Sequence, residues 1–420
     1  MAGHWGAGQH TADDPKAPGV ALKAAWLLDV QTGKLLPNPV VLIQEGKIVS
    51  IGSNAPVPQG YRRLDVGAAT LLPGLIDCHT HLLHHNDDAF PTDVAEVSGR
   101  SIALRALMGS VLAKGMLQAG FTTVRDLGNS GRGGDVALRN AIDLGYVVGP
   151  RMLVSTRALA PLGGQFGRLM PGAAALVQEE YSEFVGVEEA RKAVRRAIYE
   201  GATCIKVIAN DMNQYVSTEE LRTIVEEAHR VNLKVAAHAT GGKAIGACIA
   251  AGVDSIEHGY DLTDAELKQM AAKQIYLVPT DEPNIADQQK RLARAFKAGV
   301  PVAAGSDWYT NRRPGGQPAG GENPLLLRGR SSKVIFKAYV QAGLTPLQAL
   351  QTGTVNAGKL LSFLNPYGQR VTPGVLEAGR PADIIAVRGD VLKDIAVLDS
   401  IGFVMKEGQV FFDAYSTAGK

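Results

Sequence analysis

Two histidines separated by one residue, His79 and His81, follow the apolar run LLPGLIDC and are placed to hold one metal ion together. In an extended strand the side chains of residues i and i+2 point to the same face. Neutral imidazole is also a common metal ligand. A histidine pair on a strand is equally typical of a packed core, so the pair alone fits both a metal site and a structural role.

Four further polar residues follow short runs of small or apolar residues at the expected ends of other strands. They are Lys206 in TCIKVIAN, His238 in VAAHATG, His258 in DSIEHGY and Asp307 in VAAGSDW. Any one of them alone would most simply be a buried polar group with a local partner. Together with the histidine pair they bring six polar side chains to the same end of five strands, which favours a metal centre.

The segments around these residues alternate between strands and helices. Phe121–Asp126 has the pattern of a buried strand, Val187–Glu200 that of a helix, and Val300–Ala304 is the last strand that the pattern predicts. Thr345, Pro346 and Gln348 indicate the start of a later helix. Repeated βα units predict an α/β fold, a (β/α)8 TIM barrel with its active site at the carboxyl ends of the strands. A doubly wound open sheet is the alternative, weakened because no Gly-x-Gly-x-x-Gly sequence follows an early strand.

The two ends of the chain resemble each other and differ from the region between them. Both consist of short alternating strands, with hairpin turns expected at Glu45-Gly46 and at Glu407-Gly408. The economical interpretation is one small domain built from both ends. The expected division is a flexible leader over residues 1–19, a β-sandwich domain from residues 20–71 and 368–420, and a catalytic barrel over residues 72–367.

The composition excludes several classes of protein. A net charge of +2 in 420 residues argues against a dedicated nucleic-acid-binding protein. No apolar stretch approaches the roughly 20 residues of a membrane helix, and three cysteines cannot form a closed disulfide framework. We therefore expect a soluble protein with neither nucleic acid nor membrane as partner. As written, the N-terminus lacks the regions of a signal peptide, but Ala2 after Met1 also suits an exported form with an added start, so cytoplasmic and exported locations both stay open.

Several sequence motifs resemble the metal-dependent amidohydrolase superfamily in its two-metal form. PGLIDCHTHL, GFTTVRDLG, IEHG and GRPADIIAV carry the resemblance over essentially the whole chain. Within the superfamily the chain is similar to the branch that contains Xaa-Pro dipeptidase-like peptidases, imidazolonepropionase relatives and ochratoxin-hydrolysing amidohydrolases. The resemblance implies a bacterial-type hydrolase of amide bonds and a homo-oligomer, such as an octamer.

The resemblance also implies two divalent metal ions, of which the first is held by His79, His81 and Asp307 and the second by His238 and His258. Lys206 is expected to react with CO2 and form a carbamate that bridges the pair, because a protonated ammonium cannot bind a cation. Zinc is the first expectation for nitrogen and carboxylate ligands, although manganese and iron accept the same donors. Asp307 is expected to take a proton from the attacking water and pass it to the leaving nitrogen.

Three residues are expected to touch the substrate. Tyr215 matches a tyrosine that relatives place near a substrate carboxylate, and Gln165 in LGGQFG stands where relatives usually have a histidine. Glutamine can donate a hydrogen bond but cannot carry a proton. Trp308, beside Asp307, would add an aromatic wall. Other candidate partners for the carboxylate are Arg157, Arg312 and Arg313.

The branch resemblance implies an amide whose amine part is an amino acid. An acyl part that is bulky and flat is favoured by Trp308 together with the apolar residues Leu162, Phe166, Leu169 and Met170. Ochratoxin-like amides of phenylalanine, such as ochratoxin A cleaved to ochratoxin alpha and phenylalanine, are therefore the first hypothesis. Xaa-Pro dipeptides are the alternative on the same site. Cyclic-amide hydrolysis or deamination of the imidazolonepropionase type is a further alternative, and a non-enzymatic binding protein is disfavoured because every metal and base position is filled.

Overall fold

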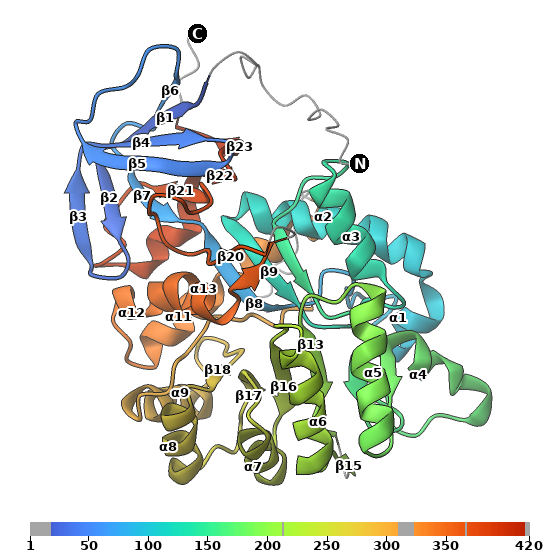
Figure 1. The fold of residues 1–420 in the computed structure, drawn as a ribbon. Coiled ribbons are helices and arrows are strands. Elements are labelled where there is room, and N and C mark those ends of the chain that lie inside the picture. The colour runs from blue at the N-terminus through green and yellow to red at the C-terminus, as the bar shows by residue number, and fades with distance from the viewer. Residues whose placement is uncertain (1–17, 212–213, 310–322, 366–367, 416–420) are drawn as a thin grey trace.

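Strands from both ends of the chain form two sheets beside the rest of the molecule. The computed structural model describes residues 18–211, 214–309, 323–365 and 368–415 (Figure 1). The four-stranded sheet has the order β5-β4-β1-β6, formed by β1 (Val20–Lys23), β4 (Pro39–Gln44), β5 (Lys47–Ser53) and β6 (Arg62–Asp65). The six-stranded sheet has the order β23-β22-β21-β7-β2-β3, formed by β2 (Trp26–Asp29), β3 (Lys34–Pro37), β7 (Thr70–Pro73), β21 (Ile384–Val387), β22 (Ile401–Lys406) and β23 (Gln409–Asp413).

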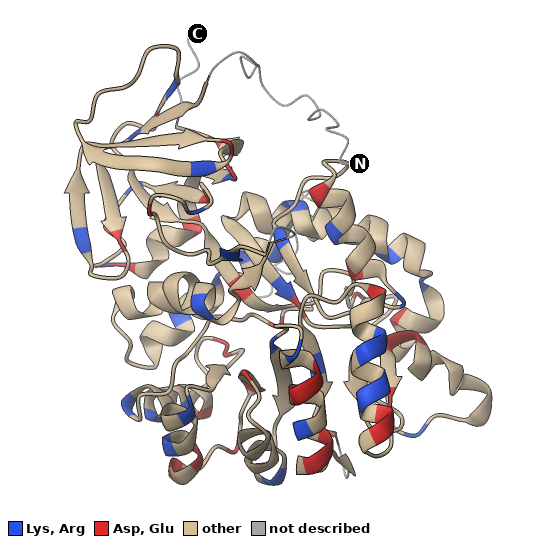
Figure 2. Ribbon diagram, in the orientation of Figure 1, with Lys and Arg blue, Asp and Glu red and all other residues tan. Residues whose placement is uncertain are grey.

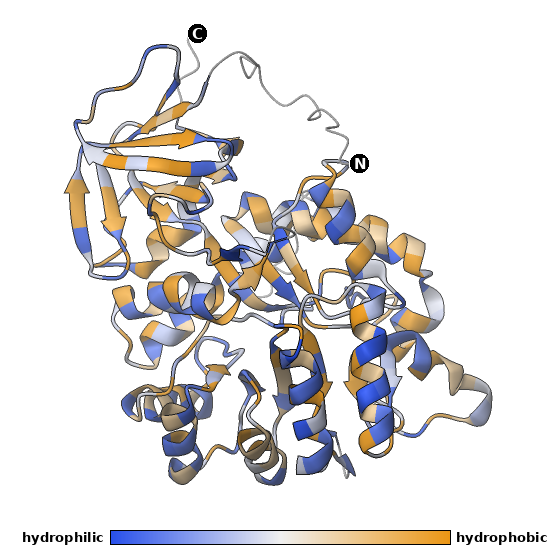
Figure 3. Ribbon diagram, in the orientation of Figure 1, coloured by the Kyte–Doolittle hydropathy of each residue, from blue (hydrophilic) through white to orange (hydrophobic). Residues whose placement is uncertain are grey.

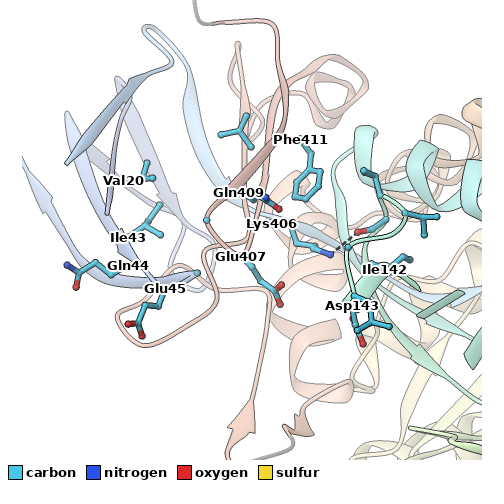
Figure 4. Close-up of a pocket in the computed structure, with 18 of the residues that line it drawn as sticks. Val20, Ile43, Gln44, Glu45, Ile142, Asp143, Lys406, Glu407, Gln409 and Phe411 are labelled. Atoms are coloured by element: carbon cyan, nitrogen blue, oxygen red, sulfur yellow. Dashed lines mark hydrogen bonds between the residues drawn. The ribbon is translucent and has the colours of Figure 1, made fainter. Parts of the chain in front are cut away.

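Both expected hairpin turns are confirmed. Glu45 and Gly46 have φ values of 47° and 74°, and Glu407 and Gly408 have values of 50° and 76°. Positive φ at both central residues is what a type I′ turn between two antiparallel strands requires. The second hairpin reaches the loop that precedes β10 (Arg151–Val154), where the Lys406 ammonium donates to the Gly149 carbonyl at 2.9 Å beside a cavity of about 880 Å³ (Figure 4).

Parallel strands alternate with helices in the region between the terminal strands. One sheet has the order β10-β9-β8, formed by β8 (Leu75–Thr80), β9 (Phe121–Asp126) and β10 (Arg151–Val154). The other has the order β12-β11-β13-β16-β17-β18, formed by β11 (Ala158–Ala160), β12 (Tyr181–Glu183), β13 (Ile205–Ile208), β16 (Val235–Ala239), β17 (Ser255–His258) and β18 (Tyr276–Val278). Every pairing within these two sheets is parallel, so their carboxyl ends lie on one side.

Helices connect these strands and cover them from outside (Figure 1). The longer helices are α2 (Ile102–Gln118), α3 (Gly134–Asp143), α5 (Val187–Glu200), α6 (Thr218–His229), α7 (Gly242–Ala251), α8 (Asp264–Lys273), α9 (Ala286–Lys297) and α11 (Val334–Gln341). The shorter helices are α1 (Asp93–Gly99), α4 (Ala175–Glu180), α10 (Arg328–Ser332), α12 (Pro346–Gln351) and α13 (Ala357–Leu360). Two small strand pairs are also present, β14 (Asn210–Asp211) with β15 (Gln214–Tyr215) and β19 (Phe363–Leu364) with β20 (Arg370–Val371).

The helix α5 shows why these segments fold as they do. It has the predicted bounds and buries Ala190, Val194 and Ala197 along one face. Its outer face carries both positive and negative residues (Figure 2), and Figure 3 shows the same division into hydrophobic and hydrophilic sides. An apolar stripe at helical spacing packs against the sheet while the charged face stays in water. Within the described residues, no helix combines the length and the apolar composition needed to cross a membrane.

The strand expected over Val300–Ala304 is reduced to a single parallel bridge between Leu277 and Val302. The segment is extended, but the Ala304 N–H donates to the Thr352 carbonyl at 2.9 Å instead of to a neighbouring strand. The Cys78 N–H in turn donates to the Ala304 carbonyl at 2.8 Å. This segment therefore links β18, β8 and the helix end at residue 352 without forming a regular ladder.

Candidate metal centre

The six polar side chains that the sequence places at strand ends surround one cavity of about 270 Å³, lined among others by His79, His81, Lys206, His238, His258 and Asp307. They come from β8, β13, β16 and β17 and from the extended segment after Val302. All are buried except His238 and Asp307, which are half-buried. The parallel strands thus bring residues that are far apart in sequence to a common end of the sheet.

Three of these residues offer ligand atoms to a common point. The His81 Nε2 atom lies 3.1 Å from the Asp307 Oδ1 atom, and His79 Nε2 lies 3.5 Å from the same oxygen. His81 Nε2 and Asp307 Oδ1 are both buried and have no hydrogen-bond partner. Buried polar atoms without a partner are costly, and two nitrogens facing one carboxylate oxygen form a donor set that suits a divalent cation.

Lys206 connects this group to the other two histidines. Its Nζ atom lies 3.5 Å from His79 Nε2. The rings of His238 and His258 are packed edge-on with centroids 4.7 Å apart, and the His258 ring lies 5.3 Å from that of His79. The residues expected to hold the second ion are therefore in contact with those expected to hold the first, with Lys206 beside them.

A second layer of hydrogen bonds orients the imidazole rings. His81 Nδ1 lies 2.9 Å from the Gly128 carbonyl oxygen, and His258 Nδ1 lies 2.8 Å from Thr280 Oγ1. His79 Nδ1 lies 2.8 Å from a carboxylate oxygen of Glu257. Because Nδ1 is occupied in each ring, Nε2 is left for the cavity, the arrangement that metal-binding histidines usually show.

Glu257 faces away from the cavity and is fully buried behind His79. Its other carboxylate oxygen accepts hydrogen bonds from Arg125 Nη2 at 2.8 Å and from Ser255 Oγ at 2.5 Å. Arg125 also donates to the Cys78 carbonyl at 2.7 Å. The ion pair between Arg125 and Glu257 therefore fixes both the ring of His79 and the strand that carries it.

The surroundings set the protonation states that a metal site needs. Burial lowers the pKa of His79 and His238 well below the usual value, and lowers that of His258 to about 4. Burial alone would raise the pKa of Asp307, but the neighbouring histidines hold it well below its ordinary range. At neutral pH the imidazoles are neutral and the carboxylate is ionised.

The residues expected to touch substrate have different positions. Gln165 lines the cavity. Tyr215 lies outside the cavity lining, half-exposed in the β14–β15 hairpin. Trp308 is not among the described residues that line the cavity. Its neighbour Tyr309 lines the cavity instead, and its ring stacks on that of His81 with centroids 4.7 Å apart. Arg157 pairs with Glu200 at 3.0 Å. Arg312, Arg313 and most of the expected leader over residues 1–19 lie outside the described residues.

The sequence analysis did not single out several residues that line the cavity: Asn86, Asp93, Asn129, Tyr260 and Tyr309. Tyr309 follows Asp307 at a spacing of two, so the rule used for His79 and His81 would have suggested it. The other four lie in loops or at a helix start after the strands, where periodicity carries no signal.

Known proteins are similar to this chain over most of its length. The sequence pattern of the amidohydrolase family matches residues 70–411. The ochratoxinase of Aspergillus niger is 32% identical, over 93% of this chain and 86% of that protein. An imidazolonepropionase of Deinococcus deserti is 26% identical, over 90% of this chain and 92% of that protein.

Solved structures of similar proteins share the fold over nearly the full length. A prolidase in complex with N-methylphosphonate-L-proline superposes with a TM-score of 0.79 at 27% identity, covering 94% of this chain and all of that one. The crystal structure of the Aspergillus niger ochratoxinase superposes with a TM-score of 0.77 at 27% identity, covering 96% of this chain and 99% of that one.

Proposed function

The chain belongs to the amidohydrolase family, and we propose that it is a metal-dependent hydrolase that cleaves the amide bond of an N-acyl amino acid or a dipeptide. The single observation that carries this proposal is the buried group of strand-end side chains around one cavity, with the free atoms His81 Nε2 and Asp307 Oδ1 facing each other. A core without a catalytic role would be expected to pair or exclude such atoms.

The residues present fit two divalent ions, one held by His79, His81 and Asp307 and the other by His238 and His258, with carboxylated Lys206 between them. Zinc is the first candidate for these nitrogen and oxygen donors. When bound, such ions polarise the substrate carbonyl and lower the pKa of water. The position of Lys206 between the two groups, 3.5 Å from His79 Nε2, supports its proposed role.

Asp307 moves the proton in the proposed reaction. Its carboxylate is ionised and faces the cavity between His79 and His81, so it can accept a proton from the attacking water. The protonated Asp307 carboxyl group then delivers that proton to the amide nitrogen. Without a proton, this nitrogen is a very poor leaving group. Glu257 and Arg125 keep the His79 ring in the orientation that this exchange needs.

We infer that the two parallel sheets belong to one (β/α)8 barrel and that residues 20–71 and 368–420 form one domain. Backbone hydrogen bonds across both gaps between the sheets support the closed barrel. On one side the Thr203 N–H donates to the Val154 carbonyl at 2.8 Å. On the other side the segment around Ala303 spans the gap: its N–H donates to the Leu277 carbonyl of β18 at 3.0 Å, and the Cys78 N–H of β8 donates to the Ala304 carbonyl at 2.8 Å. The single domain is supported by the apolar cluster that joins residues such as Leu22 and Phe403.

Among substrates, we favour amides of phenylalanine with an aromatic acyl group. This choice is supported by the ochratoxinase relative and by the rings of Tyr260 and Tyr309 in the cavity lining. The prolidase structure favours Xaa-Pro dipeptides as the second candidate. Comparing kcat/KM for ochratoxin A with that for Xaa-Pro dipeptides tests the choice. A higher value for ochratoxin A is expected, and a clear preference for Xaa-Pro dipeptides would overturn it.

A further inference from the structure

Two carboxylates are among the described residues that line the cavity, those of Asp93 and Asp307. No step of the proposed reaction uses Asp93. We propose that Asp93 determines substrate specificity by accepting a hydrogen bond from a donor group on the acyl part of the substrate, next to the scissile carbonyl. This inference rests on the proposed function and narrows its substrate class to acyl groups that carry such a donor.

The Asp93 carboxylate has acceptor capacity left for a ligand. It lies 3.0 Å from His84 Nε2 through one oxygen, and it accepts a long hydrogen bond of 3.4 Å from Asn129 Nδ2 through the other. A carboxylate offers about four lone-pair positions. Asn86 is a third hydrogen-bond partner of this carboxylate. The side chain is 35% exposed at the cavity wall, so one further donor can still reach it.

Within the part of the chain that the structure describes, the cations near Asp93 are shared with other carboxylates. Arg100 is shared between Asp87, which it contacts closely, and Glu96, at 3.3 Å. The buried His84 ring also lies 3.1 Å from Glu96. Three carboxylates therefore share one guanidinium and one imidazole. Although burial opposes it, the bond from His84 holds the pKa of Asp93 below its usual value, so the carboxylate is ionised at neutral pH.

Asp93 also lies near the proposed metal ligands in the cavity, where it can contact the acyl part of a substrate. Tyr309 stacks on His81 at 4.7 Å and packs edge-on against His84 at 5.2 Å, so a single ring separates His81 from the imidazole that contacts Asp93. A donor on the α-carbon, or on the ortho position of an aromatic ring, lies only two or three bonds from the carbonyl carbon. The α-ammonium of a dipeptide and the hydroxyl of a 2-hydroxybenzoyl group both meet this description.

The test uses two pairs of substrates that differ only in the donor. N-(2-hydroxybenzoyl)-L-phenylalanine is compared with N-benzoyl-L-phenylalanine, and L-phenylalanyl-L-phenylalanine with N-(3-phenylpropanoyl)-L-phenylalanine. A charge-assisted hydrogen bond predicts a kcat/KM about tenfold or more higher for the donor-bearing member of at least one pair. The pair that shows the preference identifies the source of the donor. If the wild-type protein prefers neither donor, the proposal is wrong.

Variants then assign the preference to Asp93. In Asp93→Asn the preference for the ammonium-bearing substrate is expected to disappear. In Asp93→Ala the preferences for the ammonium and for the hydroxyl are both expected to disappear. In each variant kcat/KM for the donor-free substrates should stay within about threefold of the wild-type value. Asp87→Asn is the matched control, since Asp87 is similarly exposed and pairs with Arg100. Equal losses on both members of a pair would show that Asp93 only supports α1 and His84, and would overturn the proposal. If the zinc-supplemented wild-type protein cleaved none of the four amides, the proposed function itself would fail.

Discussion

Lys206 differs chemically from the other side chains in the cavity, because its ammonium form repels cations. Burial lowers its pKa from 10.5 to about 8, although Glu257 and Asp307 oppose the shift. Roughly one amine in ten is then neutral at pH 7, compared with about one in three thousand for an ordinary lysine. Only the neutral amine reacts with CO2, so the environment of Lys206 favours the carbamate that we propose.

The proposed proton transfer predicts a specific effect of Asp307→Asn. The amide cannot act as a base, so kcat is expected to fall by at least about a hundredfold, while the protein folds and keeps much of its metal. Activity assays with metal analysis of the same sample check both parts. Asp287→Asn is the control, because Asp287 is exposed on α9 and pairs with Lys290 at 3.3 Å. Normal turnover in Asp307→Asn would remove Asp307 from the mechanism.

The hydrogen bond between His79 and Glu257 predicts that Glu257→Gln weakens metal binding. Partners of this kind typically contribute about 10-fold to 100-fold in metal affinity, so zinc should be released at a correspondingly higher free concentration in a chelator competition. Because the change leaves buried Arg125 without its anion, Ser255→Ala is the milder second variant. Unchanged zinc affinity in both variants would mean that Glu257 only stabilises the core.

The residues at strand ends could be predicted from the sequence, but their neighbours could not. His79, His238 and His258 each interrupt an apolar run, and parallel strands necessarily bring such residues together. Asn129 and Asp93 reach the same cavity from loops and a helix start, where local sequence does not determine position. Trp308 and Tyr309 show the limit most directly, because Asp307 before them has a φ of 50° rather than that of a strand, and of the two only Tyr309 lines the cavity.

Among the secondary-structure elements, helix caps and turns were predicted most reliably from the sequence. Thr345 caps α12 and Gln348 closes the capping box, as expected from the sequence. The strand predicted over Val300–Ala304 is shortened to one bridge at Val302, because the Ala304 N–H donates to the Thr352 carbonyl and the Ala304 carbonyl accepts from the Cys78 N–H. A short apolar run indicates burial, but it does not indicate which partner its backbone will find.

The capping box at α12 predicts the effect of Thr345→Ala. Loss of the side-chain acceptor leaves the Gln348 N–H, now at 3.2 Å from Thr345 Oγ1, without its partner. The free energy of unfolding is expected to fall by about 1 kcal/mol, measured by denaturant titration. Thr345→Ser keeps the hydroxyl and should match the wild type. A loss of activity at saturating substrate without a loss of stability would contradict a purely structural role.

Across the whole molecule, the six proposed donor positions connect strands of both parallel sheets, so metal binding should stabilise the fold. A ligand that binds only the folded state at about a thousandfold excess over its Kd adds about 4 kcal/mol. We expect chelation to lower the Tm and added zinc to restore it, as followed by calorimetry. A variant lacking two ligands, His238→Ala with His258→Ala, should respond less to both treatments. An unchanged Tm after complete metal removal would contradict this coupling.

We propose that two metal ions lie at the carboxyl ends of the strands. A crystal structure of the zinc-loaded protein, with anomalous diffraction recorded at the zinc edge, tests it most directly. We predict two adjacent anomalous peaks, one beside His79, His81 and Asp307 and the other beside His238 and His258. Extra density on Lys206 Nζ should extend between them. Absence of zinc from this cavity, with zinc present in the crystal, would contradict the account.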